Sequence, residues 1–174
     1  MDFYFINEEY INYLKRFENK IMNGSSHYKG EKFTLGVVFK INSINYYAPI
    51  SSIKDYQLEN KLKLNKEYRR TCYPIIGEYN KEDKILSTIR LDFMFPVPDL
   101  EAERLIINNI EPKKRSLIRK EYKYVITHKE EILKKAEDVY NKATVPTHFL
   151  YNKCCKFKIL ETKYQEWIFS KNAK

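Results

Sequence analysis

The order of the predicted elements constrains the fold most strongly. Apolar residues alternate or run together in five segments that predict strands: residues 2–6, 33–42, 46–50, 73–79 and 84–95. Helical spacing follows Asn7, can begin a short helix within 99–108, and dominates from Pro112 to Ala143 and over 154–167. Strands that mostly precede helices, joined by hairpin connections, favour an antiparallel α+β domain over a doubly wound α/β domain.

Length and hydropathy indicate an ordinary globular protein. With 174 residues, the chain is expected to form one domain, residues 1–174, whose core needs no disulfide or metal. The first fourteen residues mix acidic with apolar side chains and lack a basic region, unlike a signal peptide. No apolar run is long enough to span a membrane. We therefore expect a cytoplasmic protein that does not associate with membranes.

Residues that could bind a metal or cofactor are sparse. The chain has three cysteines, expected to be free thiols, and no CxxC or HxxxH spacing, so no metal site is predicted. Four glycines and the absence of a phosphate-binding loop argue against a nucleotide cofactor. Of the three histidines, only His27, in a polar loop, is a candidate for catalysis, and its role stays open.

The distribution of charge points to a polyanionic partner. Residues 1–110 hold 16 Lys and Arg against 15 Asp and Glu, whereas residues 111–174 hold 16 against 8, so most of the net charge of +9 lies in the last third. Fifteen tyrosines could include some that stack on unpaired bases, although most must pack the core. The alternative is a lysine-rich, solvated surface without a nucleic-acid partner.

Six segments, in order, resemble one protein family. They are Phe3-Tyr4 with 10–14, Tyr28 and Lys32 ahead of 36–38, the strand exit 47–52, the strand 90–98, and the helical segments 135–141 and 154–161. Together they are similar to the ToxN/AbiQ endoribonuclease toxins, from residue 3 to about 161, with 54–84 and the tail unmatched. Ser51 stands where threonine is common, and it keeps the hydroxyl.

The resemblance implies a fold, a reaction and a partner. It implies a twisted antiparallel sheet like that of the MazF/Kid toxins, elaborated by helices. It implies a sequence-specific, metal-independent endoribonuclease that leaves a 2′,3′-cyclic phosphate and a 5′-hydroxyl. The implied antitoxin is a small repeat RNA that folds as a pseudoknot, is processed by the toxin, and closes with it into a ring of three proteins and three RNAs. The implied role is phage defence by abortive infection.

The same resemblance assigns the catalytic residues: Lys32, Ser51, Ser52, Tyr10 and Tyr28. A lysine would stabilise the charge that develops on the phosphorane oxygens. Serine hydroxyls would donate to those oxygens or hold the 2′-hydroxyl in line, and tyrosines would stack on splayed bases. The groups that move the protons stay unassigned, because no side chain with a pKa near 7 is evident unless His27 enters the site.

Seven cations are predicted to contact RNA: Lys29, Lys54, Arg115, Arg119, Lys123, Lys153 and Lys156. Arg115, Arg119 and Lys123 are spaced four residues apart, about one helical turn, so they are expected to share one face of a helix. Lys153 and Lys156 would extend that surface on the final helix. The main alternative function is a non-catalytic RNA-binding module that uses these basic helices.

Overall fold

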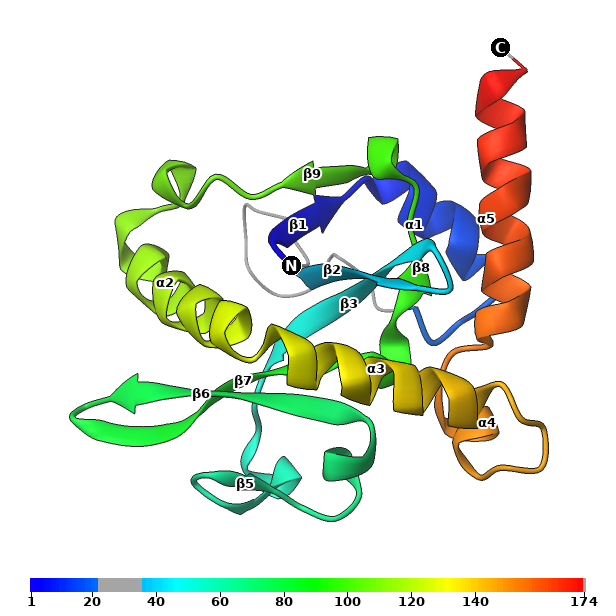
Figure 1. Ribbon diagram of the computed structural model, residues 1–174. Helices are drawn as coiled ribbons and strands as arrows, with labels where there is room; N and C mark the ends of the chain where they lie inside the picture. Colours follow the sequence, from blue (N-terminus) through cyan, green and yellow to red (C-terminus); the bar gives the residue numbers. More distant parts are fainter. Residues whose placement is uncertain (22–35, 174) are drawn as a thin grey trace.

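The computed structural model describes residues 1–21 and 36–173 and shows an α+β architecture built on an antiparallel sheet (Figure 1). Seven strands form this sheet, in the order β6-β7-β3-β2-β1-β9, with β8 paired beside β3. Their bounds are β1 Phe3–Ile6, β2 Gly36–Ile41, β3 Ile44–Ser52, β6 Cys72–Tyr79, β7 Glu82–Arg90, β8 Phe95–Pro96 and β9 Ala102–Arg104. The predicted fold class is confirmed.

Within the described residues, the other elements are a small hairpin, five α-helices and five single 3-10 turns. The hairpin pairs β4 Leu58–Asn60 with β5 Lys63–Leu64. The helices are α1 Glu8–Lys15, α2 Pro112–Thr127, α3 Lys129–Ala143, α4 Leu150–Lys153 and α5 Phe157–Asn172. In Figure 1, α2 and α3 run one after the other across the sheet, and α5 rises beside α1.

Two tight turns create the main hairpins. Asn42 and Ser43 join β2 to β3 with φ of 49° and 68°, and Asn80 and Lys81 join β6 to β7 with φ of 53° and 65°. Positive φ at both central residues is typical of a two-residue turn whose twist matches that of the flanking strands. The hairpin predicted between the second and third strands is therefore confirmed.

Strand β3 connects the two hairpins. Along one edge it pairs with β2 from Ile44 to Pro49. Along the other it pairs first with β8 and then, through its last three residues, with β7. The predicted hydroxyl-bearing strand exit at Ser51 and Ser52 thus lies where the first hairpin meets the second.

The core joins β3 to the last helices. Tyr46 and Tyr140 are almost fully buried, and both hydroxyls donate to Oε1 of Glu161, at 2.7 and 2.6 Å. The Phe157 ring stacks on Tyr140 with centroids 5.6 Å apart. On the other side of α5, Trp167 Nε1 donates to the buried Glu101 at 2.8 Å. These contacts fix α5 against the sheet.

The helix predicted from Pro112 to Ala143 is interrupted. It breaks at His128, whose φ and ψ of −107° and 19° are not helical. The His128 ring stacks on Tyr124 at 3.9 Å, and its Nδ1 lies 2.8 Å from the Tyr124 carbonyl oxygen. A side chain that bonds the preceding turn competes with the helical backbone, and the apolar spacing continues past the break.

Three other predicted boundaries were wrong for similar reasons. The long strand predicted to residue 95 ends at Arg90, because the backbone turns at Leu91–Phe93. The final helix starts at Phe157, since the Cys155 N–H donates to the Asp92 carbonyl oxygen at 2.8 Å. The short helix expected in 99–108 is replaced by the strand β9 between two single 3-10 turns.

Candidate active site

Two pairs of hydroxyl side chains lie where the end of β3 pairs with β7. The register places Ser51 opposite Thr88 and Ser52 opposite Ser87. Ser51 Oγ lies 3.2 Å from Thr88 Oγ1, within hydrogen-bonding distance. Ser52 is exposed and Ser51 half-buried, whereas their partners on β7 are buried. The structure therefore places the predicted serines at a polar site accessible to a substrate.

The two serines lie on opposite faces of the sheet, because successive side chains of a strand alternate. Ser51 and Thr88 share one face, and Ser52 and Ser87 share the other, which faces α2. Because the two serines lie on opposite faces, their hydroxyls do not approach a single phosphate from the same side. Ser52, the more exposed of the two, is better placed to contact RNA directly.

A buried carboxyl group lies behind this pair. Glu121 of α2 is 5% exposed, and burial raises the pKa of its carboxyl, while the nearby Ser87 hydroxyl acts in the opposite direction. Ser87 Oγ is itself buried and makes no hydrogen bond of good geometry with the described residues. Sequence reasoning missed both residues, because Ser87 reads as an ordinary strand residue and Glu121 as part of a charged helix surface.

Of the predicted tyrosine and lysine roles, one changes and three lie outside the described residues. Tyr10 is completely buried, and its hydroxyl donates to the Pro96 carbonyl oxygen at 2.7 Å. Its ring packs against Trp167, so Tyr10 is a core residue and is not available to stack on an RNA base. Lys32, Tyr28 and Lys29 lie outside the described residues, as does His27.

The start of β2 lies next to the end of β3. Gly36 pairs with Pro49, two residues before Ser51. A Cβ at Gly36 would lie 2.4 Å from Cζ of Tyr47 and 2.5 Å from the Ala48 carbonyl oxygen, so glycine is required for this approach. The β2 strand therefore begins beside the serine site.

The predicted cations of α2 differ in accessibility. Arg115 is half-buried and donates to the carbonyl oxygens of Asn108 and Ile110 at 3.0 and 2.9 Å. It anchors the preceding turn, so its predicted role as an RNA contact is replaced by a structural one. Arg119 is exposed, with one contact of 3.2 Å to Asn108 Oδ1, and Lys123 is exposed. These two remain accessible to phosphate.

The predicted cations near α5 do not share one helix face. Lys153 ends α4 and Lys156 precedes α5, with a non-helical segment between them. Lys153 Nζ pairs with Glu67 at 2.6 Å, and Lys156 Nζ donates to the Tyr151 carbonyl oxygen at 2.7 Å. Lys54 is exposed just beyond Ser52. A continuous surface from α2 to Lys156 is therefore not formed by these residues alone.

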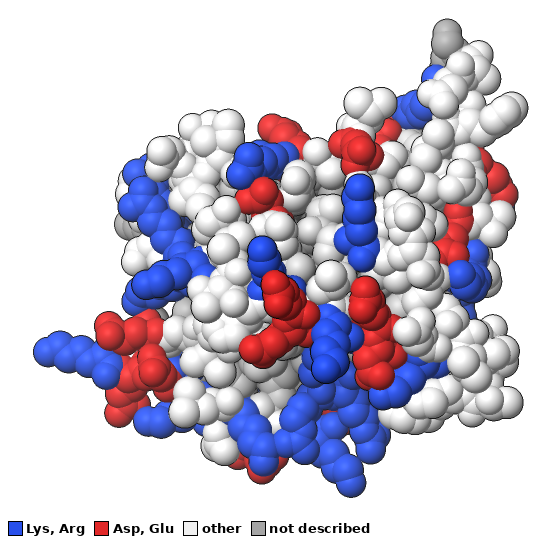
Figure 2. Space-filling model, in the orientation of Figure 1, with Lys and Arg blue, Asp and Glu red and all other residues white. Residues whose placement is uncertain are grey.

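A basic groove that sequence reasoning missed lies between α3, α4 and the turn Tyr68–Arg70. Its volume is about 470 Å³, and it is lined by four cations, Arg69, Arg70, Lys135 and Lys142, and by one acid, Asp138, which pairs with Lys142 at 2.7 Å. Figure 2 shows Lys and Arg side chains gathered in this region, below α3. The Arg70 guanidinium lies 4.9 Å from the centre of the half-exposed Phe149 ring. Cations beside an exposed ring suit single-stranded RNA.

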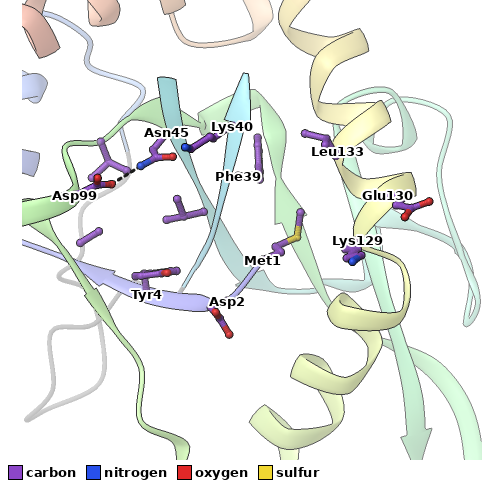
Figure 3. Close-up of a pocket in the computed structure, with 13 residues that line it drawn as sticks. Met1, Asp2, Tyr4, Phe39, Lys40, Asn45, Asp99, Lys129, Glu130 and Leu133 are labelled. Carbon is purple, nitrogen blue, oxygen red and sulfur yellow. Dashed lines mark hydrogen bonds between the residues drawn. The ribbon is translucent and has the colours of Figure 1, made fainter. Parts of the chain in front are cut away.

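Another cavity, of about 610 Å³, lies elsewhere (Figure 3). It is lined by the start of β1, the β2–β3 turn region and the first residues of α3, where Asn45 donates a hydrogen bond to Asp99. Its charges are mixed, with Asp2, Asp99 and Glu130 against Lys40 and Lys129. This balance gives a polyanion no net attraction, so the cavity is not our candidate for RNA binding.

Other sequence expectations were tested over the described residues. Within residues 1–21 and 36–173, no group of His, Cys, Asp and Glu side chains is arranged to bind a metal ion. Cys72, Cys154 and Cys155 are buried and free, as predicted, and burial raises the pKa of the first two to about 12. No helix in the same ranges combines the length and apolar character needed to cross a membrane.

Comparison with known proteins gives consistent matches over nearly the whole chain. Residues 2–165 match the family described as toxin ToxN of the type III toxin–antitoxin system. Endoribonuclease AbiQ of Lactococcus lactis subsp. lactis is 34% identical over 166 residues, which cover 92% of this chain and 86% of AbiQ. Endoribonuclease ToxN of Pectobacterium atrosepticum is 30% identical over 176 residues, covering 99% and 96%.

Solved structures agree with the sequence matches. The structure of AbiQ, a lactococcal anti-phage endoribonuclease, superposes with a TM-score of 0.72 at 30% identity, covering 98% of each chain. A toxin that is selectively inhibited by a non-coding RNA pseudoknot superposes with a TM-score of 0.76 at 27% identity, covering 96% of this chain and 98% of that one. Together with the family match and the hydroxyl site at the end of β3, these likenesses show that the chain is an endoribonuclease toxin of the ToxN family of type III toxin–antitoxin systems.

Proposed function

We propose that this toxin cuts RNA at preferred sequences without a metal ion, leaving a 2′,3′-cyclic phosphate and a 5′-hydroxyl. In this reaction the ribose 2′-oxygen attacks the adjacent phosphorus and the 5′-oxygen leaves. The supporting observation is the exposed Ser52 hydroxyl at the β3 end of a fold that matches endoribonucleases along its length. A hydroxyl there can hold the 2′-oxygen in line, and orientation is a large part of such catalysis.

Lys32 is proposed as the cation that stabilises the phosphorane. It lies four residues before Gly36 in the sequence, and Gly36 pairs with Pro49 beside the serines. Tyr28 keeps its proposed role of stacking on a base next to the cut. Ser51, paired with Thr88 on the other face, is proposed to support the β3 end.

The proposed antitoxin is a small repeat RNA that folds as a pseudoknot, which the toxin cuts from a longer transcript and which then inhibits it. Its proposed contacts are Arg119 and Lys123 on α2 and the basic groove around Arg70 and Lys142, where exposed cations can contact phosphates. Lys29 and Lys54 are proposed to contact RNA beside the cut site. A pseudoknot that bridges two protein surfaces suits a closed ring, proposed to hold three toxins and three RNAs.

The biological proposal follows from this pair. Residues 1–174 would act as one toxin domain in the bacterial cytoplasm, held inactive by the RNA until phage infection disturbs the complex. Released toxin would then cut cellular or phage RNA, which is defence by abortive infection. AbiQ, at 34% identity, is an anti-phage endoribonuclease, which supports this role.

The test is to incubate purified toxin with its upstream repeat transcript in excess EDTA and to analyse the ends. We expect fragments that resist ligation at the 3′ end until the cyclic phosphate is removed and that accept phosphate at the 5′ end. Cleavage that stops in EDTA and returns with Mg²⁺ would contradict the metal-independent mechanism. Tight binding of the transcript without any cutting would instead favour the non-catalytic RNA-binding module.

A further inference from the structure

The interior of the toxin contains a carboxyl group that no described cation neutralises. Glu121 is 5% exposed, and no residue within 1–21 or 36–173 forms an ion pair with it. Buried carboxyl groups are uncommon unless they are paired, because burial removes the hydration of the charged form. By contrast, the buried Glu101 accepts a hydrogen bond from Trp167 Nε1, and Glu18 accepts one from the Lys156 N–H.

The neighbour of Glu121 is the Ser87 hydroxyl, which connects it to the proposed site. Ser87 lies close enough to lower the pKa of the Glu121 carboxyl, although it makes no hydrogen bond of good geometry. Across the sheet, Ser87 is paired with Ser52. Side chains in such directly opposed positions have Cβ atoms about 4.5–5.5 Å apart. A row of polar groups therefore leads from the exposed Ser52, through Ser87, to the buried Glu121.

The proposed reaction lacks a group that accepts the proton of the 2′-hydroxyl, and this row ends in one. We propose that Glu121 is a positioning residue for RNA cleavage, which orients Ser87 and Ser52 and accepts through their hydroxyls the proton that the 2′-oxygen loses. The inference rests on the proposed function. When the Glu121 carboxylate accepts a hydrogen bond from the Ser87 hydroxyl, Ser87 Oγ can accept a hydrogen bond from the Ser52 hydroxyl. Ser52 Oγ can then accept a hydrogen bond from the substrate.

The proton and the electron pairs balance in this step. As O2′ bonds to phosphorus, its proton passes to Ser52 Oγ, the Ser52 proton passes to Ser87 Oγ, and the Ser87 proton passes to Glu121. The bond from phosphorus to O5′ breaks, and O5′ keeps the electron pair and takes a proton from water. Glu121 then returns its proton to the solvent by the same path, so the enzyme is unchanged.

The geometry also predicts how the rate depends on pH. Glu121 must be ionised to accept a proton, and burial raises the pKa at which it ionises. The relay is therefore present above that pKa and lost as the pH falls through it, which gives the profile an acid limb above the ordinary range of a glutamate.

Neighbouring titratable groups do not share this role, because their side chains have partners elsewhere. On α2, Lys120 bonds the Glu78 carbonyl oxygen and Tyr122 bonds Asp2. On the neighbouring elements, Tyr73 of β6 bonds Glu131 of α3, and the Lys84 ammonium of β7 lies over the Tyr79 ring. Arg90 of β7 lies on the opposite face, with Thr88, and pairs with Asp92. An acid limb that depends on both Ser87 and Glu121 would therefore identify the relay.

The experiment measures single-turnover cleavage against pH for wild type, Glu121→Gln and Ser87→Ala, on the RNA that the wild type cuts. The matched control is Glu101→Gln, which makes the same change at a carboxyl of similar burial, 8% exposed, that bonds Trp167. We expect Glu121→Gln and Ser87→Ala to lower the maximal rate by about 100-fold, with an unchanged KM, and to flatten the acid limb. Glu101→Gln should keep the wild-type rate and profile.

Other outcomes are equally decisive. A Glu121→Gln protein that keeps the acid limb, whether slower or not, would overturn the relay and leave Glu121 a packing residue. If that variant does not fold, Ser87→Ala decides alone by the same criterion. A wild type that cuts no RNA would overturn the proposed function and the relay together, whereas an active wild type with unaffected variants overturns the relay only.

Discussion

Removing one hydroxyl from the buried cluster at Glu161 tests how α5 stabilises strand β3. Tyr46 of β3 and Tyr140 of α3 both donate to Glu161 Oε1, and Lys158 Nζ lies 2.9 Å from Oε2. In Tyr46→Phe, the ring packing is kept and one hydrogen bond to a charged group is lost. Such bonds contribute about 1.5–3 kcal/mol. Because Tyr140 and Lys158 still contact the carboxylate, we expect the lower part of that range, about 1.5–2 kcal/mol.

The effect should also depend on pH with a defined sign. Burial raises the pKa of Glu161, but the hydrogen bonds from Lys158, Tyr140 and Tyr46 outweigh it, so the net shift is downward. A carboxyl with a lowered pKa in the folded state contributes stability above its unfolded pKa, roughly 4.3, and loses that contribution as the pH falls through the folded value. The difference between wild type and Tyr46→Phe should therefore shrink in acid.

The assay is urea unfolding of wild type, Tyr46→Phe, Glu161→Gln and the double variant, at pH 7 and in mild acid. A loss of about 1.5–2 kcal/mol corresponds to a fall in Tm of roughly 3–8 °C for a chain of this size. In the double-mutant cycle the two losses should fail to add by about 0.5 kcal/mol or more. Additive losses, or a Tyr46→Phe protein as stable as wild type, would refute the assigned contact.

Three further predictions concern activity. Lys32→Ala should fold normally and lose about two to three orders of magnitude in cleavage rate, as measured on the repeat RNA, and a wild-type rate would remove Lys32 from the site. Cleavage should persist in excess EDTA, and metal-restored activity would count against the mechanism. The double variant Arg119→Glu with Lys123→Glu should weaken RNA binding and flatten the slope of log affinity against log salt concentration by roughly 0.7 to 0.9 per lost contact. An unchanged affinity and slope would place the RNA on another surface, and Arg70→Glu tests the basic groove in the same assay.

The fold followed from the sequence because periodicity and turn residues are local signals. Alternation located the strands, and the segment 42–45 between two of them indicated the turn of the central hairpin, which the structure places at Asn42 and Ser43. The boundaries that were wrong depend on contacts between distant residues, such as the Cys155 N–H with the Asp92 carbonyl oxygen. No local pattern encodes those contacts, and the break at His128 was masked because apolar spacing continues through it.

The candidate site was predictable only in part. Sequence resemblance located Ser51 and Ser52, but their alternation onto opposite faces requires the register with Thr88 and Ser87. Tyr10 sits in a helix that could face either solvent or core, and the Pro96 carbonyl oxygen that accepts its hydroxyl becomes its neighbour only on folding. The basic groove combines Arg70 with Lys142, which are too far apart in sequence for any spacing rule to connect them.

The long-range contacts of β3 also bear on when the toxin can act during its own synthesis. Ser52 acquires its β7 partner only after residue 87 has been made, and Tyr46 acquires its carboxylate only with residue 161. Pairings this distant in sequence form late and slowly, since the intervening chain must first be ordered. A nascent chain that has not yet exposed residue 161 therefore lacks the contacts that complete the packing of β3.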